Sequence, residues 1–307
     1  PMRADRPLLG IMLMIGFCAM APVADAMAKL LGGRVPLSEM LLVRFAAQGL
    51  LLLPVIWLTG RRLSLTRGAF KLTVLRSLLH IVGLGAMFTA LRFLPLADAV
   101  AMAFVMPFIM LLLGWLVLSE EVGWHRLLAC TVGFAGTLLV VQPSFAAVGA
   151  PALLPLLVAF VFALFMLVSR KLARENDPIV LQALSGMVST LILAPVALLF
   201  AHARLPFFEV MLPGAEEWGL LLGVGVLGTL GHLLMTWALR FAPAATLAPI
   251  QYLEIPLATA VGWLVFRDLP DGIAALGIVV IMCAGLYILL VERAIPRPAA
   301  ASPQSAE

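Results

Sequence analysis

Charged side chains are scarce in this chain of 307 residues. Only 12% of them are Asp, Glu, Lys or Arg, whereas 63% are hydrophobic. Soluble globular proteins average about 25% charged and about 45–50% apolar residues. A soluble fold of this length could not bury so much apolar surface, so the composition indicates an integral membrane protein whose solvent is lipid. The net charge of +4 is small and the basic residues lie in loops, which argues against nucleic-acid binding.

Cysteine and catalytic motifs are also sparse. The three cysteines, Cys18, Cys130 and Cys283, lie in apolar segments and form no CxxC, so we expect neither a disulfide framework nor a metal site. The sequence has no HExxH and no Walker motif, and it places no paired midplane aspartates and no Ser–His pair. We therefore expect no enzymatic activity, no cofactor and no ATP-driven transport.

Glycine is present in one pattern that resembles a nucleotide site. Residues 223–228, GVGVLG, match the dinucleotide fingerprint GxGxxG, but they lie inside an apolar span with no preceding strand. Close helix packing is the better interpretation. Gly219 and Gly223 form a GxxxG, which we predict packs its helix within the monomer rather than driving dimerisation.

Long apolar segments dominate the chain. A spanning helix needs about 20 residues, because each one advances about 1.5 Å across a hydrocarbon core about 30 Å thick. We predict a short cytoplasmic N-terminus over residues 1–6, without a cleavable signal, and a disordered cytoplasmic tail over residues 292–307. Between them, ten segments are long enough to span: 7–30, 37–58, 71–93, 97–119, 124–141, 150–172, 178–200, 217–239, 243–266 and 271–291.

These segments form two copies of one unit. Residues 90–95, ALRFLP, return as residues 238–243, ALRFAP, and residues 114–117, GWLV, return as residues 262–265, both at an offset of 148. The copies cover residues 7–141 and 149–291. Because each contains an odd number of helices, the second must enter the membrane from the opposite face. The predicted fold is therefore all-α, with ten transmembrane helices arranged as two inverted five-helix repeats.

The charges of equivalent loops support the inversion and set the orientation. Opposite charges in equivalent loops are expected when the two loops lie on opposite membrane faces. With the N-terminus inside, we expect both termini to be cytoplasmic in a bacterial inner membrane. The loop before the third helix carries Arg61, Arg62, Arg67 and Lys71, and its equivalent before the eighth carries Glu209, Glu216 and Glu217.

The repeated motifs resemble those of the drug/metabolite transporter superfamily, and of its EamA family in particular. That resemblance implies a secondary transporter of small metabolites that works by alternating access, with a cavity between its halves and amino-acid exporters as the nearest general model. Members of the family carry amino acids, riboflavin, nucleotide-related compounds and others. The resemblance is carried by Lys29, Pro36, Arg44, residues 94–97, Pro107, Glu120, residues 241–245, residues 248–249, Tyr252, Pro256 and residues 266–268.

Glu254 is the clearest candidate for a substrate contact. It lies about eleven residues into the predicted ninth helix, about 16 Å along the axis and near the midplane, where an ionisable group costs from about 2.5 kcal/mol upward. Gln251 is on the same face and Tyr252 is adjacent, while Met106 occupies the equivalent position of the first repeat. The carboxylate either recognises a substrate ammonium or carries a proton. The alternative is a structural acid, protonated or paired with a neighbouring helix.

Other polar side chains allow two interpretations each. His80 and His232 either line the cavity or pack between helices. Arg76, one turn before His80, is predicted to be an anchor that snorkels to the cytoplasmic interface. Phe104 and Trp237 are predicted to contact apolar parts of the substrate.

Asp25, Lys29 and Arg44 form a second group near the outer ends of the first two helices. Asp25 and Lys29 are spaced as an i,i+4 ion pair, which acts either as a gate or as a structural pair. Arg44 either pairs with Asp25 across the helix junction or snorkels to the interface.

One midplane carboxylate without a fixed arginine beside it favours a zwitterionic or cationic solute. We therefore predict a monomeric transporter of neutral amino acids or related compounds, with export favoured and proton coupling left open. The alternative within the family is import of riboflavin or a nucleotide-related metabolite. An intramembrane enzyme or a non-transporting sensor is the alternative from another class, but a sensor would require neither an inverted repeat nor a midplane acid.

Overall fold

The computed structural model of the chain describes residues 6–106, 108–109, 124–200, 211–242, 247 and 250–294. Within these ranges the fold is all-helical and contains no β-strand. Several predicted features lie outside the described residues: Pro107, residues 114–117, Glu120, Glu209, residues 243–246, residues 248–249 and the tail beyond residue 294.

Seven of the described helices are long and apolar enough to cross a bilayer. The chain is therefore a multi-pass membrane protein, as the composition predicted. Two described helices are shorter, namely α4 (Leu96–Ala103) and α11 (Glu254–Phe266). Helix α12 (Gly272–Ala294) is also apolar. A short 3₁₀ helix, η1 (Ala150–Leu153), precedes α7. The seven long helices are α1 (Pro7–Leu31), α2 (Leu37–Leu58), α3 (Arg67–Ala90), α6 (Trp124–Val148), α7 (Leu154–Glu175), α8 (Pro178–Phe200) and α9 (Ala215–Phe241).

Polar side chains just before the helices fix several helix starts. The hydroxyl of Thr66 accepts a hydrogen bond from the backbone N–H of Ala69 at 3.2 Å, so α3 begins at Arg67 and not at the predicted residue 71. The carboxylate of Asp177 likewise accepts from the N–H of Ile179 at 2.9 Å at the start of α8. These caps satisfy N–H groups that have no partner within the helix.

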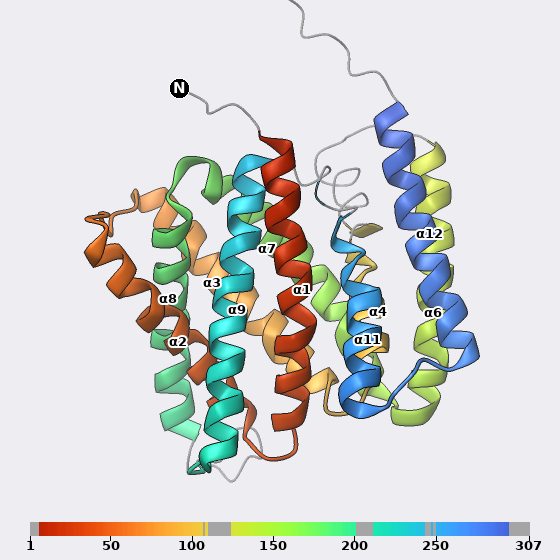
Figure 1. Cartoon of the computed structure of the whole chain (residues 1–307), viewed down its shortest axis with the longest axis horizontal. Helices are drawn as coiled ribbons and strands as arrows, with labels where there is room; N and C mark the ends of the chain where they lie inside the picture. The colour runs from red at the N-terminus through yellow and green to blue at the C-terminus, as the bar shows by residue number, and fades with distance from the viewer. Residues whose placement is uncertain are drawn as a thin grey trace, which may run out of the picture.

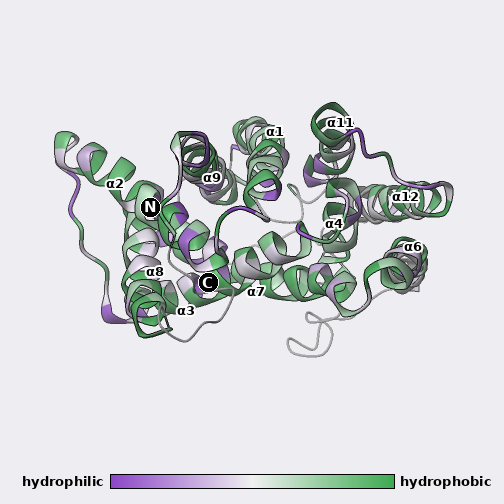
Figure 2. Ribbon diagram, turned by 90° about the horizontal axis from the view of Figure 1, so that it is seen from below, coloured by the Kyte–Doolittle hydropathy of each residue, from purple (hydrophilic) through white to green (hydrophobic). Residues whose placement is uncertain are grey.

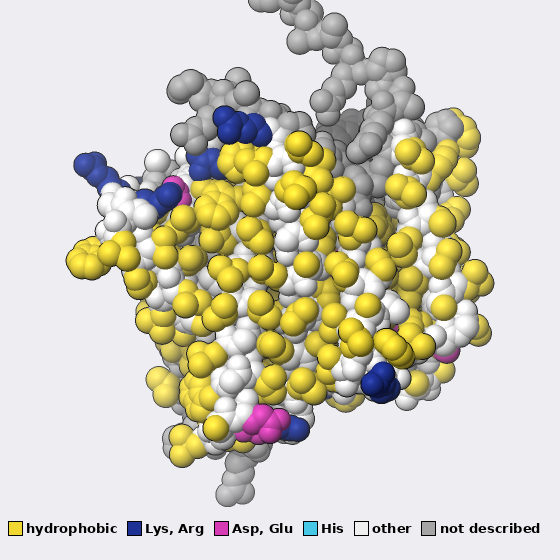
Figure 3. All heavy atoms as spheres, viewed as in Figure 1, with side chains coloured by type: hydrophobic (Ala, Val, Ile, Leu, Met, Phe, Trp, Pro, Cys, Tyr) yellow, Lys and Arg dark blue, Asp and Glu magenta, His cyan; other side chains and the backbone are white. Residues whose placement is uncertain are grey.

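The surface has the polarity of a protein surrounded by lipid. Hydrophobic side chains cover the middle of the face seen in Figure 3, and charged side chains gather at its two ends. In this view the basic groups concentrate at the end where α1 begins. The ring of Trp57, near the end of α2, is 81% exposed, which fits an aromatic residue at the membrane–water interface.

The helices pack in matched pairs. α1 lies against α9, α3 against α7, α2 against α8, and α6 against α12. Figure 1 shows these pairs running side by side, with the start of α1 and the end of α12 at the same end of the molecule. Seen from below in Figure 2, α9, α1 and α11 form one layer and α3 and α7 the opposite layer.

Glycines allow α9 to approach α1 and α2 closely. A Cβ on Gly223 would lie 2.6 Å from the sulfur of Met27, and one on Gly225 would lie 2.7 Å from the Cβ of Ala47. A Cβ on Gly228 would collide with the guanidinium of Arg44. The GxGxxG pattern is therefore a helix-packing surface, as predicted. Gly219, by contrast, has no neighbour within 4 Å, so only Gly223 of the GxxxG pattern packs inside the monomer.

Two helices are interrupted by the same kind of turn. After α4 ends at Ala103, the N–H of Val105 donates to the carbonyl of Met102 at 3.3 Å. Just before α11, the N–H of Leu253 donates to the carbonyl of Ile250 at 3.1 Å. Both are i→i−3 bonds, which tighten the backbone relative to an α-helix. Val105 and Leu253 are 148 residues apart, the same offset as the repeated motifs.

The second turn changes the expected setting of Glu254. The sequence predicted a spanning segment over residues 243–266, and within it α11 begins at Glu254 itself, after the turn at Tyr252 and Leu253. Glu254 therefore lies in the first turn of a helix, where the helix dipole stabilises a carboxylate.

Candidate substrate cavity

A cavity opens between the two helix layers. Its empty space is about 930 Å³, open solvent at the mouth included, and its walls come from α1, α2, α3, α4, α7, α9 and α11 together with the turns before Met106 and Glu254. The lining is mostly apolar, with the rings of Phe17, Phe104 and Phe162 among it. A concave, mainly apolar space with a few convergent polar groups is the usual form of a small-molecule site.

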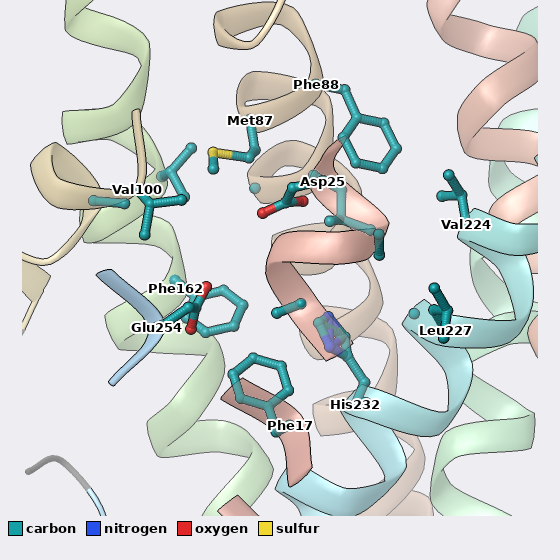
Figure 4. A pocket seen from close by; sticks show the side chains of 18 of the residues that line it. Phe17, Asp25, Met87, Phe88, Val100, Phe162, Val224, Leu227, His232 and Glu254 are labelled. Atoms are coloured by element: carbon teal, nitrogen blue, oxygen red, sulfur yellow. The ribbon is translucent and has the colours of Figure 1, made fainter. Parts of the chain in front are cut away.

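Two carboxylates from different helices face this space. Asp25 follows Ala21 and Phe17 at intervals of one helical turn, and all three line the cavity from α1. Glu254 reaches the cavity from the start of α11, and Figure 4 shows both carboxylates directed toward the same interior. Among the described residues neither acid forms a hydrogen bond or an ion pair.

Arg44 and His232 line the cavity from α2 and α9. The Arg44 side chain is only 2% exposed, and its Nη1 donates to the Oε1 of Gln48 at 3.1 Å. Its Nη2 is buried and has no hydrogen-bond partner in the described part of the chain. Arg44 therefore does not snorkel, and it interacts with Asp25 only electrostatically, without a direct ion pair. The cavity that Glu254 lines thus also contains an arginine.

The two histidines lie together, but only one reaches the cavity. The ring centroids of His80 and His232 are 4.4 Å apart with an interplanar angle of 32°. His232 lines the cavity, whereas His80 is 1% exposed and packs against the rings of Phe45 and Phe165. The ring nitrogens of both histidines have no hydrogen-bond partner among the described residues. This geometry favours the packing interpretation for His80.

The remaining candidate residues divide between the cavity and the surrounding core. Gln251, Phe104 and Met106 line the cavity. The ring of Tyr252 lies 5.3 Å from that of Phe104 and packs onto α12 beside Gly285, outside the lining. Trp237 does not reach the cavity either. Its side chain packs against a separate apolar cluster that includes Leu52, Ile179, Val180 and Leu233.

The predicted Asp25–Lys29 ion pair does not form. The Nζ of Lys29 instead donates to the backbone carbonyl of Leu94 and lies 5.2 Å from the ring centroid of Phe266. The long lysine side chain thus reaches the turn between α3 and α4, while the short Asp25 side chain faces the cavity. This prediction was wrong because the i,i+4 spacing takes no account of partners on other helices.

The prediction for Arg76 was also wrong. Its side chain is 0% exposed and does not snorkel. Nε donates to the hydroxyl of Ser169 at 2.8 Å, Nη1 to that of Ser185 at 2.6 Å, and Nη2 to the Oε1 of Gln182 at 2.8 Å. The guanidinium also lies 4.6 Å from the ring centroid of Phe165. Ser169, Ser185 and Gln182 are polar residues isolated within the apolar spans of α7 and α8, and this pattern in the sequence could have indicated that Arg76 has buried partners.

Sequence comparisons give a consistent classification. The pattern of the EamA-like transporter family matches residues 8–142 and again residues 150–291. An S-adenosylmethionine uptake transporter of Rickettsia prowazekii is 26% identical over 271 residues, which are 88% of this chain and 89% of that protein. A riboflavin transporter of Vibrio cholerae is 30% identical over 257 residues, 83% of each chain. The pseudopaline exporter of Pseudomonas aeruginosa is 26% identical over 281 residues, 90% of this chain and 95% of the exporter.

Structural comparison supports the same fold. A protein of known crystal structure, 19% identical in sequence, superposes with a TM-score of 0.64. The match covers 91% of this chain and 96% of the other. At this identity the likeness describes the fold alone.

Proposed function

The chain belongs to the EamA-like transporter family, and from this premise we propose that it moves neutral amino acids or related compounds across a bacterial inner membrane, with export as the favoured direction. The observation that carries the proposal is the pair of carboxylates, Asp25 and Glu254, in a mostly apolar cavity. A carboxylate without a partner in a mostly apolar cavity is costly, and a substrate ammonium between the two acids would offset that cost. The relatives include both an uptake transporter and an exporter, so direction is part of the test.

The mechanism that we propose is alternating access between two inverted five-helix repeats, ten spans in all. The family pattern matches the chain twice, which supports a duplication. The helix pairs have the matching symmetry: exchanging the two halves converts the α1–α9 pair into α7–α3 and leaves α2–α8 and α6–α12 unchanged. The turns before Met106 and Glu254, 148 residues apart, both lie at the cavity, which supports a site at the repeat interface.

Two surface ion pairs support the inversion and the orientation. Arg34 pairs with Glu216 at 2.8 Å, joining the α1–α2 loop to the start of α9. Arg61 pairs with Asp177, joining the α2–α3 loop to the α7–α8 loop. Exchange of the halves relates one pair to the other with the signs of charge reversed. We propose that the end carrying Arg61 and both termini is cytoplasmic, where basic residues are enriched, and that the transporter acts as a monomer.

Riboflavin import is the second candidate. It is favoured by the similarity to the riboflavin transporter of Vibrio cholerae and by the aromatic rings in the cavity wall. A flavin ring system would stack on such rings. It carries no ammonium group, however, and would leave Asp25 and Glu254 without a partner.

The test is counterflow into proteoliposomes that contain the purified protein. Radiolabelled neutral amino acids, S-adenosylmethionine and riboflavin would be compared with empty liposomes. We expect saturable exchange of at least one amino acid or of S-adenosylmethionine, and none of riboflavin. Exchange of riboflavin alone would favour the second candidate, and exchange of no compound would contradict the proposal. Efflux from inverted vesicles of known sidedness would then settle the direction.

A further inference from the structure

We infer that Arg44 and His232 form a second recognition pole, which binds the carboxylate of a zwitterionic substrate whose ammonium group faces Asp25 and Glu254. This inference rests on the proposed function and deepens it, because it states what holds the other end of the substrate. The two poles together fit the head group of an α-amino acid.

The unused donors of Arg44 are the first line of support. A guanidinium carries five N–H donors, yet the only hydrogen bond from the Arg44 side chain within the described residues is the one from Nη1 to Gln48. Nη2 is buried, without a partner, in a side chain that lines the cavity. Leaving a buried charged donor unsatisfied is costly. A carboxylate accepts from two guanidinium N–H groups at once and would satisfy it.

The backbone of α9 positions the guanidinium. Gly228 leaves room for Arg44, because a Cβ at this position would collide with it. His232 follows Gly228 by four residues and therefore lies one turn along on the same face of α9. The guanidinium and the imidazole thus stand next to each other on one wall. A histidine ring carries at least one N–H in either protonation state, so His232 would supply a further donor to the carboxylate.

Glu254 faces this wall from the other side of the cavity, and Asp25 lies between (Figure 4). Figure 4 places Glu254 on one side of the interior and His232, with Leu227, on the other, and Asp25 between them. Asp25 interacts electrostatically both with Arg44 and with Glu254, which fits its intermediate position. A substrate that spans the cavity therefore meets carboxyl groups at one end and hydrogen-bond donors at the other. The rings of Phe17, Phe104 and Phe162, which also line the cavity, would contact the side chain of the substrate.

The experiment uses three related probes: L-phenylalanine, its methyl ester, which lacks the carboxylate, and 3-phenylpropanoate, which lacks the amine. Binding to the purified protein in detergent would be measured by calorimetry. For the wild type we expect L-phenylalanine to bind about tenfold or more tightly than the ester, the effect of losing a charge-assisted hydrogen bond. Arg44→Gln should remove most of that preference and abolish binding of 3-phenylpropanoate. Glu254→Gln should weaken binding of the ester and leave the affinity for 3-phenylpropanoate unchanged.

Matched variants separate recognition from folding. Arg92→Gln removes an arginine that donates to the carbonyl of Val35 outside the cavity, and it should leave all three affinities unchanged. If Arg44→Gln does not fold, Gly228→Ala retains Arg44 but displaces its guanidinium, and it should lower the acid-to-ester preference in the same way.

The outcomes distinguish the two proposals. If the ester depends on Glu254 but the preference for the acid survives Arg44→Gln and Gly228→Ala, the ammonium site stands and the carboxylate pole is wrong. If Arg44→Gln abolishes binding of 3-phenylpropanoate while Glu254→Gln leaves the affinity for the ester unchanged, the carboxylate pole stands and the proposed ammonium recognition fails. If the wild type binds none of the probes, both are overturned.

Discussion

Arg76 and Arg44 are both buried in the membrane-spanning region, with 0% and 2% of their surface exposed, but the groups around them differ. Arg76 donates to two hydroxyls and an amide oxygen at 2.6–2.8 Å, with the hydroxyl of Thr236 at 3.4 Å. Within the described ranges the Arg44 side chain forms one hydrogen bond, to Gln48, and it lines a cavity. The comparison teaches that neutral hydroxyl and amide groups can satisfy the donors of a buried arginine in place of an acid. Where such partners are missing, the remaining donors are available to a ligand.

The positions of the two arginines strengthen the contrast. Arg76 joins α3 of the first half to α7, α8 and α9 of the second through side chains alone. Arg44 instead stands between α2 and α9, with space provided by Gly228 and the cavity beyond. We therefore assign Arg76 a structural role and Arg44 a role in binding, and the two roles predict different mutant phenotypes.

The largest effect is expected for Arg76→Met. The substitution removes the guanidinium and leaves Ser169, Ser185 and Gln182 with unsatisfied buried groups. Because each such group costs about 1–3 kcal/mol, we expect a loss of about 3 kcal/mol or more in the free energy of unfolding. Thermal unfolding of the purified variant in detergent would measure it. The acid-to-ester preference of any protein that remains folded should be unchanged. A variant as stable as the wild type, or one with altered preference, would contradict the structural role.

Gly228→Ala should have the next largest effect, and mainly on binding. The new Cβ collides with the Arg44 guanidinium, so we expect the affinity for a zwitterionic substrate to fall by about tenfold, which corresponds to about 1.4 kcal/mol. Gly219→Ala on the same helix is the matched control, because that position has no neighbour within 4 Å. Substrate titrations of counterflow rates would compare the two variants. Equal behaviour of both would mean that the position of Arg44 is immaterial.

The histidine pair predicts a smaller difference. His232→Phe removes a donor from the cavity wall and should raise the apparent KM several-fold, because a single hydrogen bond contributes about 0.5–1.5 kcal/mol. His80→Phe should change KM little, since His80 already packs among Phe45, Phe165 and the ring of His232. The same counterflow assay measures both variants. A larger effect from His80→Phe at unchanged stability would show that the ring behind the cavity wall takes part in transport.

The orientation can be tested with changes that should not affect transport at all. Ser64→Cys, in the α2–α3 loop, should be shielded from impermeant thiol reagents in intact cells. Leu212→Cys, just before α9 and 94% exposed, should be labelled. Both would be introduced after replacing the three native cysteines with serine. The reversed pattern of labelling would overturn the proposed orientation of the charged loops.

Features that depend on local sequence could be predicted. The bounds of α2 and α8 follow from apolar length and from Pro36 and Pro178, and the sequence predicted both helices correctly. Polarity inside an apolar span identified Glu254, and the 148-residue offset identified Met106, and both line the cavity. The roles assigned to these two residues remain predictions.

Features that depend on partners from other helices could not be predicted from the sequence. The partners of Arg76 lie about 90 or more residues away in the chain, and hydropathy alone made snorkelling the simpler expectation. For the same reason, the sequence did not indicate that Lys29 donates to the backbone carbonyl of Leu94 instead of pairing with Asp25. The turn before Glu254 contains two i→i−3 hydrogen bonds, from Leu253 to Ile250 and from Ile255 to Tyr252, whose positions hydropathy does not indicate.

The most direct test of the account is counterflow by Glu254→Gln in proteoliposomes, at matched protein levels and from mildly acidic to mildly basic pH. Gln keeps the shape and the hydrogen-bonding capacity of the side chain but cannot carry charge. We predict that the variant is folded and that its flux is abolished or sharply reduced, while Met106→Leu, at the equivalent position of the other repeat, transports nearly as well as the wild type because the exchange conserves volume. Transport by Glu254→Gln at the wild-type rate with the same pH profile would contradict the account, since the acid would then be structural.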